Sequence, residues 1–159
     1  MATIKKKFIG DKQFGGFTPY GNLTTLRATL QTTAAGAVID GDSTAALAIG
    51  DVVVLEKLPE GFVLEDAQLI VSTGMTASAT GSLGFLYADG VDSAAVPQDA
   101  AYFGAGLNAA TAARIRTAGA KAPVRLAKEA YLVWTHAGSA NAKASRIDVI
   151  VHGERLGPN

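Results

Sequence analysis

Alternation of apolar and polar residues at every second position dominates the chain after residue 50 and most constrains its fold. In the segment ASRIDVIVHGE, the residues Ile147, Val149 and Val151 fall on one side of an extended chain, opposite charged and polar residues. Successive side chains of a β-strand point to opposite faces, so this period of two predicts a strand with one buried face.

Four further stretches show the same period between Gly, Asp and Pro turn signals, at residues 50–61, 62–74, 80–90 and 129–138. In the first of these strands, we expect Val52, Val54 and Leu58 to share one face. In the third, the expected face consists of Leu83, Phe85 and Tyr87, and in the fourth, Leu132, Trp134 and His136 alternate with their neighbours.

The second stretch contains an interruption. We expect Val63, Ala67, Leu69 and Val71 to line one face, but Glu65 falls among them and predicts a β-bulge or a strand edge.

The remaining segments are weaker but compatible with β-structure. Residues 22–31 and 123–127 each predict a strand, and residues 34–51 contain two short apolar runs between Gly-Asp turns. About eight short strands with frequent turns are typical of an antiparallel sandwich or barrel. The exception is the segment 97–121, whose Ala-rich start predicts one or two helical turns near Asp99–Phe103. A long connection of this kind usually carries a function or a contact, so Tyr102 and Phe103 are candidate contact residues.

The chain divides into an N-terminal arm, residues 1–22, and one β-domain, residues 23–159. The arm is rich in Gly, aromatic and basic residues and contains no apolar run. It is too polar to fold alone.

Composition excludes several classes of function. The 14 Lys and Arg residues balance the 14 Asp and Glu residues, so the chain has no long-range field for nucleic acid or for a membrane surface. No apolar stretch approaches the roughly 20 residues of a membrane-spanning helix, and no secretory signal is visible. With no Cys in the sequence, thiolate metal sites and Cys nucleophiles are excluded.

No group of residues predicts an active site, a cofactor or a bound metal. His136 and His152 lie on predicted strands without a third ligand, and we interpret both as structural. The Asp-Gly pairs at Asp40 and Asp89 are typical of turns. Basic residues between positions 114 and 128 are expected to be scattered by strand alternation. The sequence therefore favours a structural or binding module, and we expect no enzymatic activity.

Five segments together resemble the small capsid decoration, or cement, proteins of tailed bacteriophages, which are of jelly-roll type. These segments are IGDVVVLEKLPEGFVLEDAQLIVS, GSLGFLYADGVD, QDAAYFGAGLNAA, EAYLVWTHAG and SRIDVIVHG. The resemblance implies an all-β, antiparallel jelly-roll sandwich of about eight strands with an extended N-terminal arm.

The same resemblance implies an assembly role. Such proteins bind the outer surface of an expanded capsid, commonly as homotrimers, and bridge subunits of the major capsid protein. The expected location is the virion, after synthesis in the bacterial cytoplasm. The arm would then become ordered on a partner, with its lysines meeting acidic groups and its aromatic side chains filling pockets. The candidate contact residues in the arm are Lys5, Lys6, Lys7, Phe8, Phe14, Phe17 and Tyr20.

Two alternatives belong to other classes. A carbohydrate- or receptor-binding β-sandwich of a phage head or tail fibre would need exposed aromatic residues, and Trp134 lies in the middle of a strand, where core packing is expected. A small enzyme of cupin type would need a His-rich metal set, which two histidines do not provide.

Overall fold

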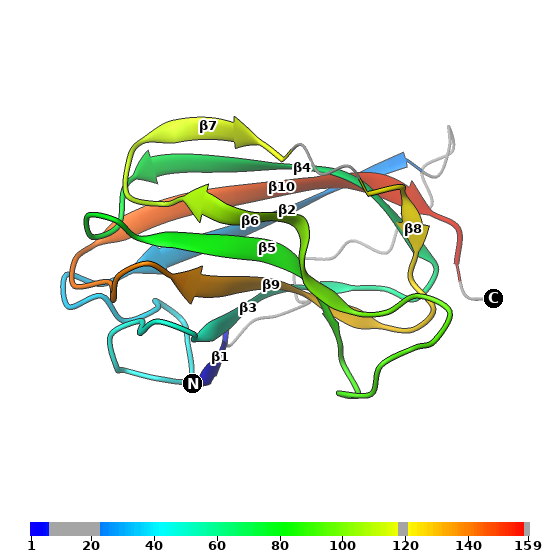
Figure 1. Ribbon diagram of the computed structural model, residues 1–159, viewed down its shortest axis with the longest axis horizontal. Coiled ribbons are helices and arrows are strands. Elements are labelled where there is room, and N and C mark those ends of the chain that lie inside the picture. The colour runs from blue at the N-terminus through cyan, green and yellow to red at the C-terminus, as the bar shows by residue number, and fades with distance from the viewer. Residues whose placement is uncertain (7–22, 118–120, 158–159) are drawn as a thin grey trace.

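A computed structural model describes residues 1–6, 23–117 and 121–157 of the 159-residue chain. These residues form ten β-strands and no helix (Figure 1). The strands are β1 (Thr3–Lys5), β2 (Leu23–Thr32), β3 (Val52–Leu58), β4 (Phe62–Thr73), β5 (Thr80–Tyr87), β6 (Asp99–Asn108), β7 (Ala113–Arg116), β8 (Val124–Arg125), β9 (Ala130–Ala137) and β10 (Ser145–Arg155).

Two sheets pack face to face as a sandwich, which confirms the predicted all-β fold. One sheet, called here the β9 sheet, has the order β1-β3-β9-β5-β6. The other, called the β10 sheet, has the order β2-β10-β4-β7, and β8 also pairs with β4. All pairings are antiparallel except that of β1 with β3, which is parallel. The inward faces of both sheets form one continuous hydrophobic core.

Three of the predicted strand faces are confirmed. On β10, Ile147, Val149 and Val151 are buried in the core, and their polar neighbours point outward. On β5, the predicted face of Leu83, Phe85 and Tyr87 also enters the core. On β9, the three residues predicted to share one face, Leu132, Trp134 and His136, are all buried. In each case the alternation continues without interruption, so the sequence pattern identifies the buried face.

Bulges change the buried face on two other strands. The pairing of β3 with β9 shifts register between Val54 and Glu56, so the core receives Val53, Leu55 and Leu58. The predicted face of Val52, Val54 and Leu58 is therefore wrong, because one extra residue reverses the direction of every side chain after it.

On β4 the predicted bulge at Glu65 is confirmed. His152 pairs with Asp66 and Gly153 with Leu64, which leaves Glu65 without an opposite residue. Before the bulge, Phe62 and Leu64 point into the core, and the prediction that Val63 shares the inward face is wrong.

The predicted helical turns near Asp99–Phe103 are also wrong, because these residues begin β6. β6 pairs with β5 through two register shifts, and Gly84 makes room for it: a Cβ atom at Gly84 would lie 2.1 Å from the carbonyl oxygen of Asp99. Pairing with β5 and burial of Tyr102 and Phe103 outweigh the weak helical preference of the alanines.

The described residues form ten strands, compared with the eight or so predicted. β8 lies in a segment predicted as a strand, whereas β1, β6 and β7 were not predicted, and β1 and β8 contain only three and two residues. Residues 33–51 form a loop with isolated bridges, such as Ala37 with Ala46.

Candidate interaction surfaces

The first residues of the predicted arm are attached to the sandwich. β1 extends the β9 sheet at the β3 edge, and the side chain of Ile4 is only 2% exposed in the core. The buried carboxylate of Asp51 accepts hydrogen bonds from the backbone N–H groups of Ala2, at 2.8 Å, and Ala48, at 2.9 Å. The first six residues are therefore held by a strand pairing, a buried side chain and a carboxylate.

Two of the predicted contact lysines lie in this region. Lys5 is exposed, and its backbone N–H donates to the carboxylate of Asp42 at 3.0 Å. The Nζ of Lys6 donates to the backbone carbonyl of Thr29 on β2 at 2.6 Å. The other arm candidates, Lys7, Phe8, Phe14, Phe17 and Tyr20, lie outside the described residues.

Tyr102 and Phe103 are buried, at 7% and 4% exposure, and their rings pack edge to face with centroids 5.0 Å apart. The hydroxyl of Tyr102 lies 2.9 Å from the carbonyl oxygen of Ala122 and 3.2 Å from that of Leu64. Burial raises the pKa of the Tyr102 hydroxyl. These two candidates pack inside the sandwich and are not on its outer surface.

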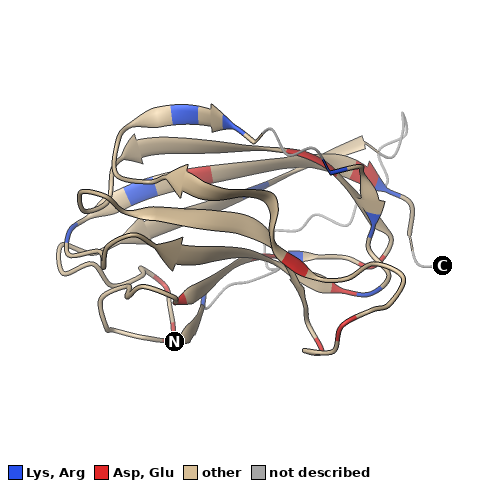
Figure 2. Ribbon diagram, in the orientation of Figure 1, with Lys and Arg blue, Asp and Glu red and all other residues tan. Residues whose placement is uncertain are grey.

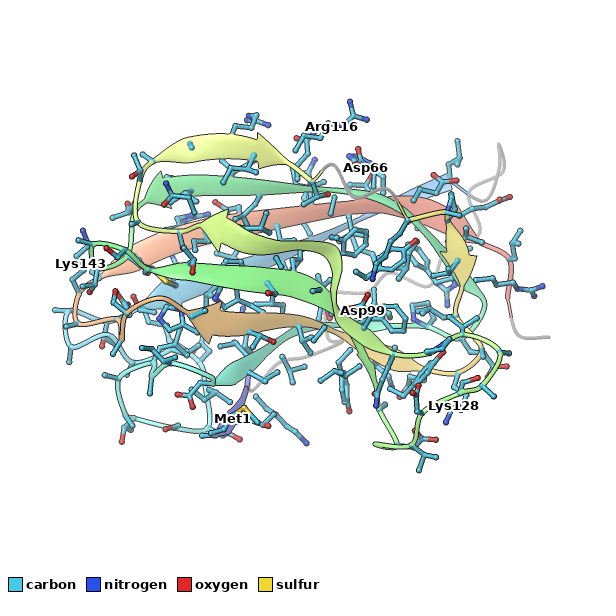
Figure 3. The ribbon with its side chains drawn as sticks, in the orientation of Figure 1. Met1, Asp66, Asp99, Arg116, Lys128 and Lys143 are labelled. Atoms are coloured by element: carbon cyan, nitrogen blue, oxygen red, sulfur yellow. The ribbon has the colours of Figure 1, made fainter. Side chains whose placement is uncertain are left out.

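The outward face of the β10 sheet carries charges of both signs. Arg146 bonds Asp148 at 3.0 Å, and Arg116 bonds Asp66 at 2.9 Å (Figure 3). The hydrogen bonds from Arg146 lower the pKa of the Asp148 carboxyl. Residues of this face include Arg27, Thr29, Asp66, Gln68, Arg114, Arg116, Arg146, Asp148, His152 and Glu154. Mixed charges of this kind are typical of a face in contact with water.

The outward face of the β9 sheet is different. Along its middle strands, β9 and β5, no charged residue occurs (Figure 2). The side chains that alternate with the core residues on β9, β5 and the adjacent β3 are Val52, Val54, Ser82, Leu86, Tyr131, Val133 and Thr135, and two of them, Val54 and Val133, are only 2% and 1% exposed. The two faces of the sandwich therefore differ in chemistry.

As predicted from the strand alternation, the basic residues between positions 114 and 128 are scattered and do not form one patch. Arg116 lies beside Asp66, whereas Lys128 lies on the opposite side of the molecule, 2.7 Å from Asp89 (Figure 3). Lys121 pairs with Asp99. Each of these charges is neutralised locally by an acidic neighbour.

Trp134, His136 and His152, which were considered as possible functional residues, make contacts typical of structural residues. Trp134 is buried in the core, as predicted, and so is unavailable at the surface. The Nε2 of His136 lies 2.8 Å from the carbonyl oxygen of Ser139, and burial lowers the pKa of this imidazole. The Nδ1 of His152 lies 3.1 Å from the hydroxyl of Thr25. Among the residues described, no three His, Cys, Asp or Glu side chains are grouped as metal ligands.

The sequence does not predict that β2 lies at the edge of a sheet. β2 is the edge strand of the β10 sheet, and the alternation in residues 22–31 shows its two faces but not its neighbours. Edge position depends on strand order, which no short sequence signal encodes.

None of the described residues forms a helix long and apolar enough to cross a membrane.

Comparison with known proteins shows a shared fold. No protein-family model and no curated protein sequence matches the chain. Its structure is similar to a chain in the capsid of Ralstonia phage GP4, with a TM-score of 0.62 and 16% identity over 96% of this chain and 97% of that chain. It is also similar to a chain in the capsid asymmetric unit of cyanophage Pam1, with a TM-score of 0.57 and 14% identity over 89% and 91% of the two chains. At these identities the similarity concerns the fold, and function has to be argued separately.

Proposed function

We propose that this chain is a structural protein of a phage virion, which binds the outer surface of the capsid and stabilises the shell by bridging capsid subunits. The observation that carries this proposal is the similarity to chains of two phage capsid structures, which extends over nearly the full length of this chain and of each of the others. The sandwich therefore corresponds to almost the whole of each matched chain and not to one domain of a larger protein.

The strand order supports a jelly-roll classification. The chain passes from β2 in one sheet to β3 in the other, then to β4, and back to β5 and β6. It then returns to the β10 sheet with β7 and β8. Finally, β9 lies between β3 and β5 in the β9 sheet, and β10 lies between β2 and β4 in the β10 sheet. Two four-stranded sheets wound in this way are the arrangement of a jelly roll, with β7 and β8 sharing one strand position.

The similarity to capsid chains supports an assembly role. The outward face of the β9 sheet does not add to this support, because Val54 and Val133 on that face are only 2% and 1% exposed within the chain. The proposed partners are the major capsid protein and further copies of this chain in a homotrimer. We propose a structural role and no catalysis.

In this proposal the arm contributes to capsid binding, and the structure restricts which part can do so. Ile4 belongs to the core, so deletion of the entire arm would damage the fold as well as the contact. Of the proposed contact residues in the arm, Lys5 is exposed, and Lys7, Phe8, Phe14, Phe17 and Tyr20 lie outside the described residues.

The test replaces the aromatic residues without shortening the chain. A variant with Phe8, Phe14, Phe17 and Tyr20 changed to Ser retains β1 and the length of the connection. The matched control changes four exposed apolar residues outside the arm, Ile39, Ile49, Val91 and Leu156, to Ser. Occupancy on expanded heads of the cognate phage is measured by co-sedimentation.

The arm variant is expected to lose most of its occupancy, and the control is expected to retain it. Unchanged occupancy of the arm variant would refute the role of the arm. Failure of the unaltered protein to bind heads would refute capsid binding itself.

The alternative of a carbohydrate-binding sandwich has no support from the described residues. Trp134 is in the core, and no aromatic side chain among the residues described is fully exposed for stacking on a sugar.

A further inference from the structure

The outer edge of β2 between Leu23 and Arg27 is not covered by any strand that the structure describes. On its inner side β2 pairs with β10 along its whole length. On its outer side only the later part is occupied: the backbone N–H of Ile39 donates to the carbonyl of Gln31 at 2.8 Å, and Lys6 Nζ donates to that of Thr29. An unpaired strand edge is a template for another strand.

The outward backbone groups of this edge can be assigned. The carbonyls of Thr29 and Gln31 point away from β10, and in a strand the N–H and C=O of one residue point to the same side, which alternates along the chain. Leu23, Thr25 and Arg27 therefore also present their backbone groups outward. Three residues at every second position can form a short antiparallel ladder.

Two opposite charges flank this edge on the outward face of the β10 sheet. Glu154 on β10 lies directly opposite Leu23, and Arg27 lies four residues further along β2. Neither charge has an ion-pair partner among the described residues. Leu23, directly opposite Glu154, is 73% exposed, which is unusual for a large apolar side chain on an edge strand.

We infer that this edge pairs with the same edge of a second copy of the chain, antiparallel and about a two-fold axis at Thr25. In this register Thr25 faces Thr25 of the other copy, and Leu23 faces Arg27 in both directions. All three pairs use the outward backbone groups. A register centred on Arg27 would instead place two guanidinium groups opposite each other, which is unfavourable.

The charges support this choice of partner. In the proposed pairing, Arg27 of one copy lies two strand spacings, about 10 Å, from Glu154 of the other, on the same face. The two long side chains can meet over Leu23, and the symmetry forms this ion pair twice. The second copy thus brings an opposite charge to both Arg27 and Glu154 and covers Leu23.

This contact does not depend on the proposed function. A two-fold contact is isologous, so it joins two single chains or two trimers equally well.

The test uses the absence of Cys from the sequence, because a disulfide in a single-Cys variant can form only between two copies. In the proposed pairing the two Thr25 Cα atoms lie about 5.5 Å apart, a distance that a disulfide spans. The variant Thr25→Cys is oxidised mildly and analysed on a non-reducing gel. The matched control is Gln31→Cys, on the same strand and the same face, where the edge is already occupied by Ile39.

Thr25→Cys is expected to form covalent dimers at least about tenfold faster than Gln31→Cys, while both variants retain the thermal unfolding transition of the parent. Equal rates of cross-linking would overturn the proposal. The gel reports pairs of chains, so a three-fold assembly or a failure to bind capsids does not affect the result.

A charge exchange tests the register. Arg27→Glu places like charges near Glu154 and is expected to weaken self-association, measured by sedimentation equilibrium, about tenfold. The double variant Arg27→Glu with Glu154→Arg is expected to restore most of it. If the double variant associates no better than the single variant, the proposed pairing of Arg27 with Glu154 is wrong.

Discussion

At the scale of single residues, the core depends on close contacts that allow no added atoms. Trp134 on β9 lies over Gly81 of β5, where a Cβ atom would be only 2.1 Å from the Cζ2 atom of the indole. The indole is in the centre of the β9 sheet and cannot move without displacing other buried side chains.

Gly81→Ala is therefore expected to lower the free energy of unfolding by about 1–3 kcal/mol, as overpacking does in well-packed cores. Chemical denaturation with an unchanged m-value measures this directly. The control is Ser82→Ala, the next residue on the same strand, which points outward and is expected to change stability by less than about 0.5 kcal/mol. Equal effects of the two substitutions would contradict the assigned contact.

His136 makes the fold sensitive to mild acid. Burial lowers the pKa of its imidazole, whereas in the unfolded chain a histidine titrates near 6.5. The unfolded state therefore binds more protons below that pH, so the contribution of neutral His136 is complete above about pH 6.5 and is lost as the pH falls through the lowered pKa.

The expected result is a decrease in the free energy of unfolding between pH 7.5 and pH 5.5. His136→Gln, which keeps a donor near Ser139 but does not titrate, is expected to show a smaller decrease over the same range. A parallel decrease in both proteins would assign the acid sensitivity to other groups.

At the scale of elements, β1 shows how a strand of three residues can stabilise a sheet edge. Its parallel pairing with β3 is short, so most of its contribution comes from the burial of Ile4 in the core. Ile4→Ala is expected to lower the free energy of unfolding by about 2–5 kcal/mol, the usual range for such truncations.

The control for β1 is Thr3→Ala, because Thr3 lies on the same strand with an exposed side chain. Thermal or chemical unfolding of the two variants compares them. A loss of stability no larger for Ile4→Ala than for Thr3→Ala would mean that β1 is not docked as described.

Elements with unbroken alternation are predictable from the sequence. The buried faces of β5 and β10 follow directly from the period of two. The bulge of β4 is also predictable, because the charged residue Glu65 interrupts a row of apolar residues. At Leu55, by contrast, the extra residue is itself apolar, so the alternation conceals the bulge and reverses the predicted face.

The parts that could not be predicted depend on partners distant in sequence. β6 is a strand because β5 offers an edge and Gly84 offers space. The same holds for the open edge at Leu23, since the position of β2 is decided by β10 and β4, more than 30 residues away. Strand order is a property of the assembled sheets.

At the scale of the whole molecule, the described residues form two packed sheets, and among them no three His, Cys, Asp or Glu side chains are grouped as metal ligands. The outer edge of β2, where Leu23 is 73% exposed, is the described feature that we propose as a contact between chains. The sequence segments that resemble cement proteins and the structural similarity to capsid chains agree on the fold.

The most direct test of capsid binding is a binding isotherm on sealed, DNA-filled heads of the cognate phage that lack this protein. Such heads expose only their outer surface, and bound protein is separated by sedimentation. If the chain binds the outer surface of the capsid as proposed, binding is expected to saturate at a fixed number of copies per head. Protein that remains in the supernatant at every concentration would contradict it.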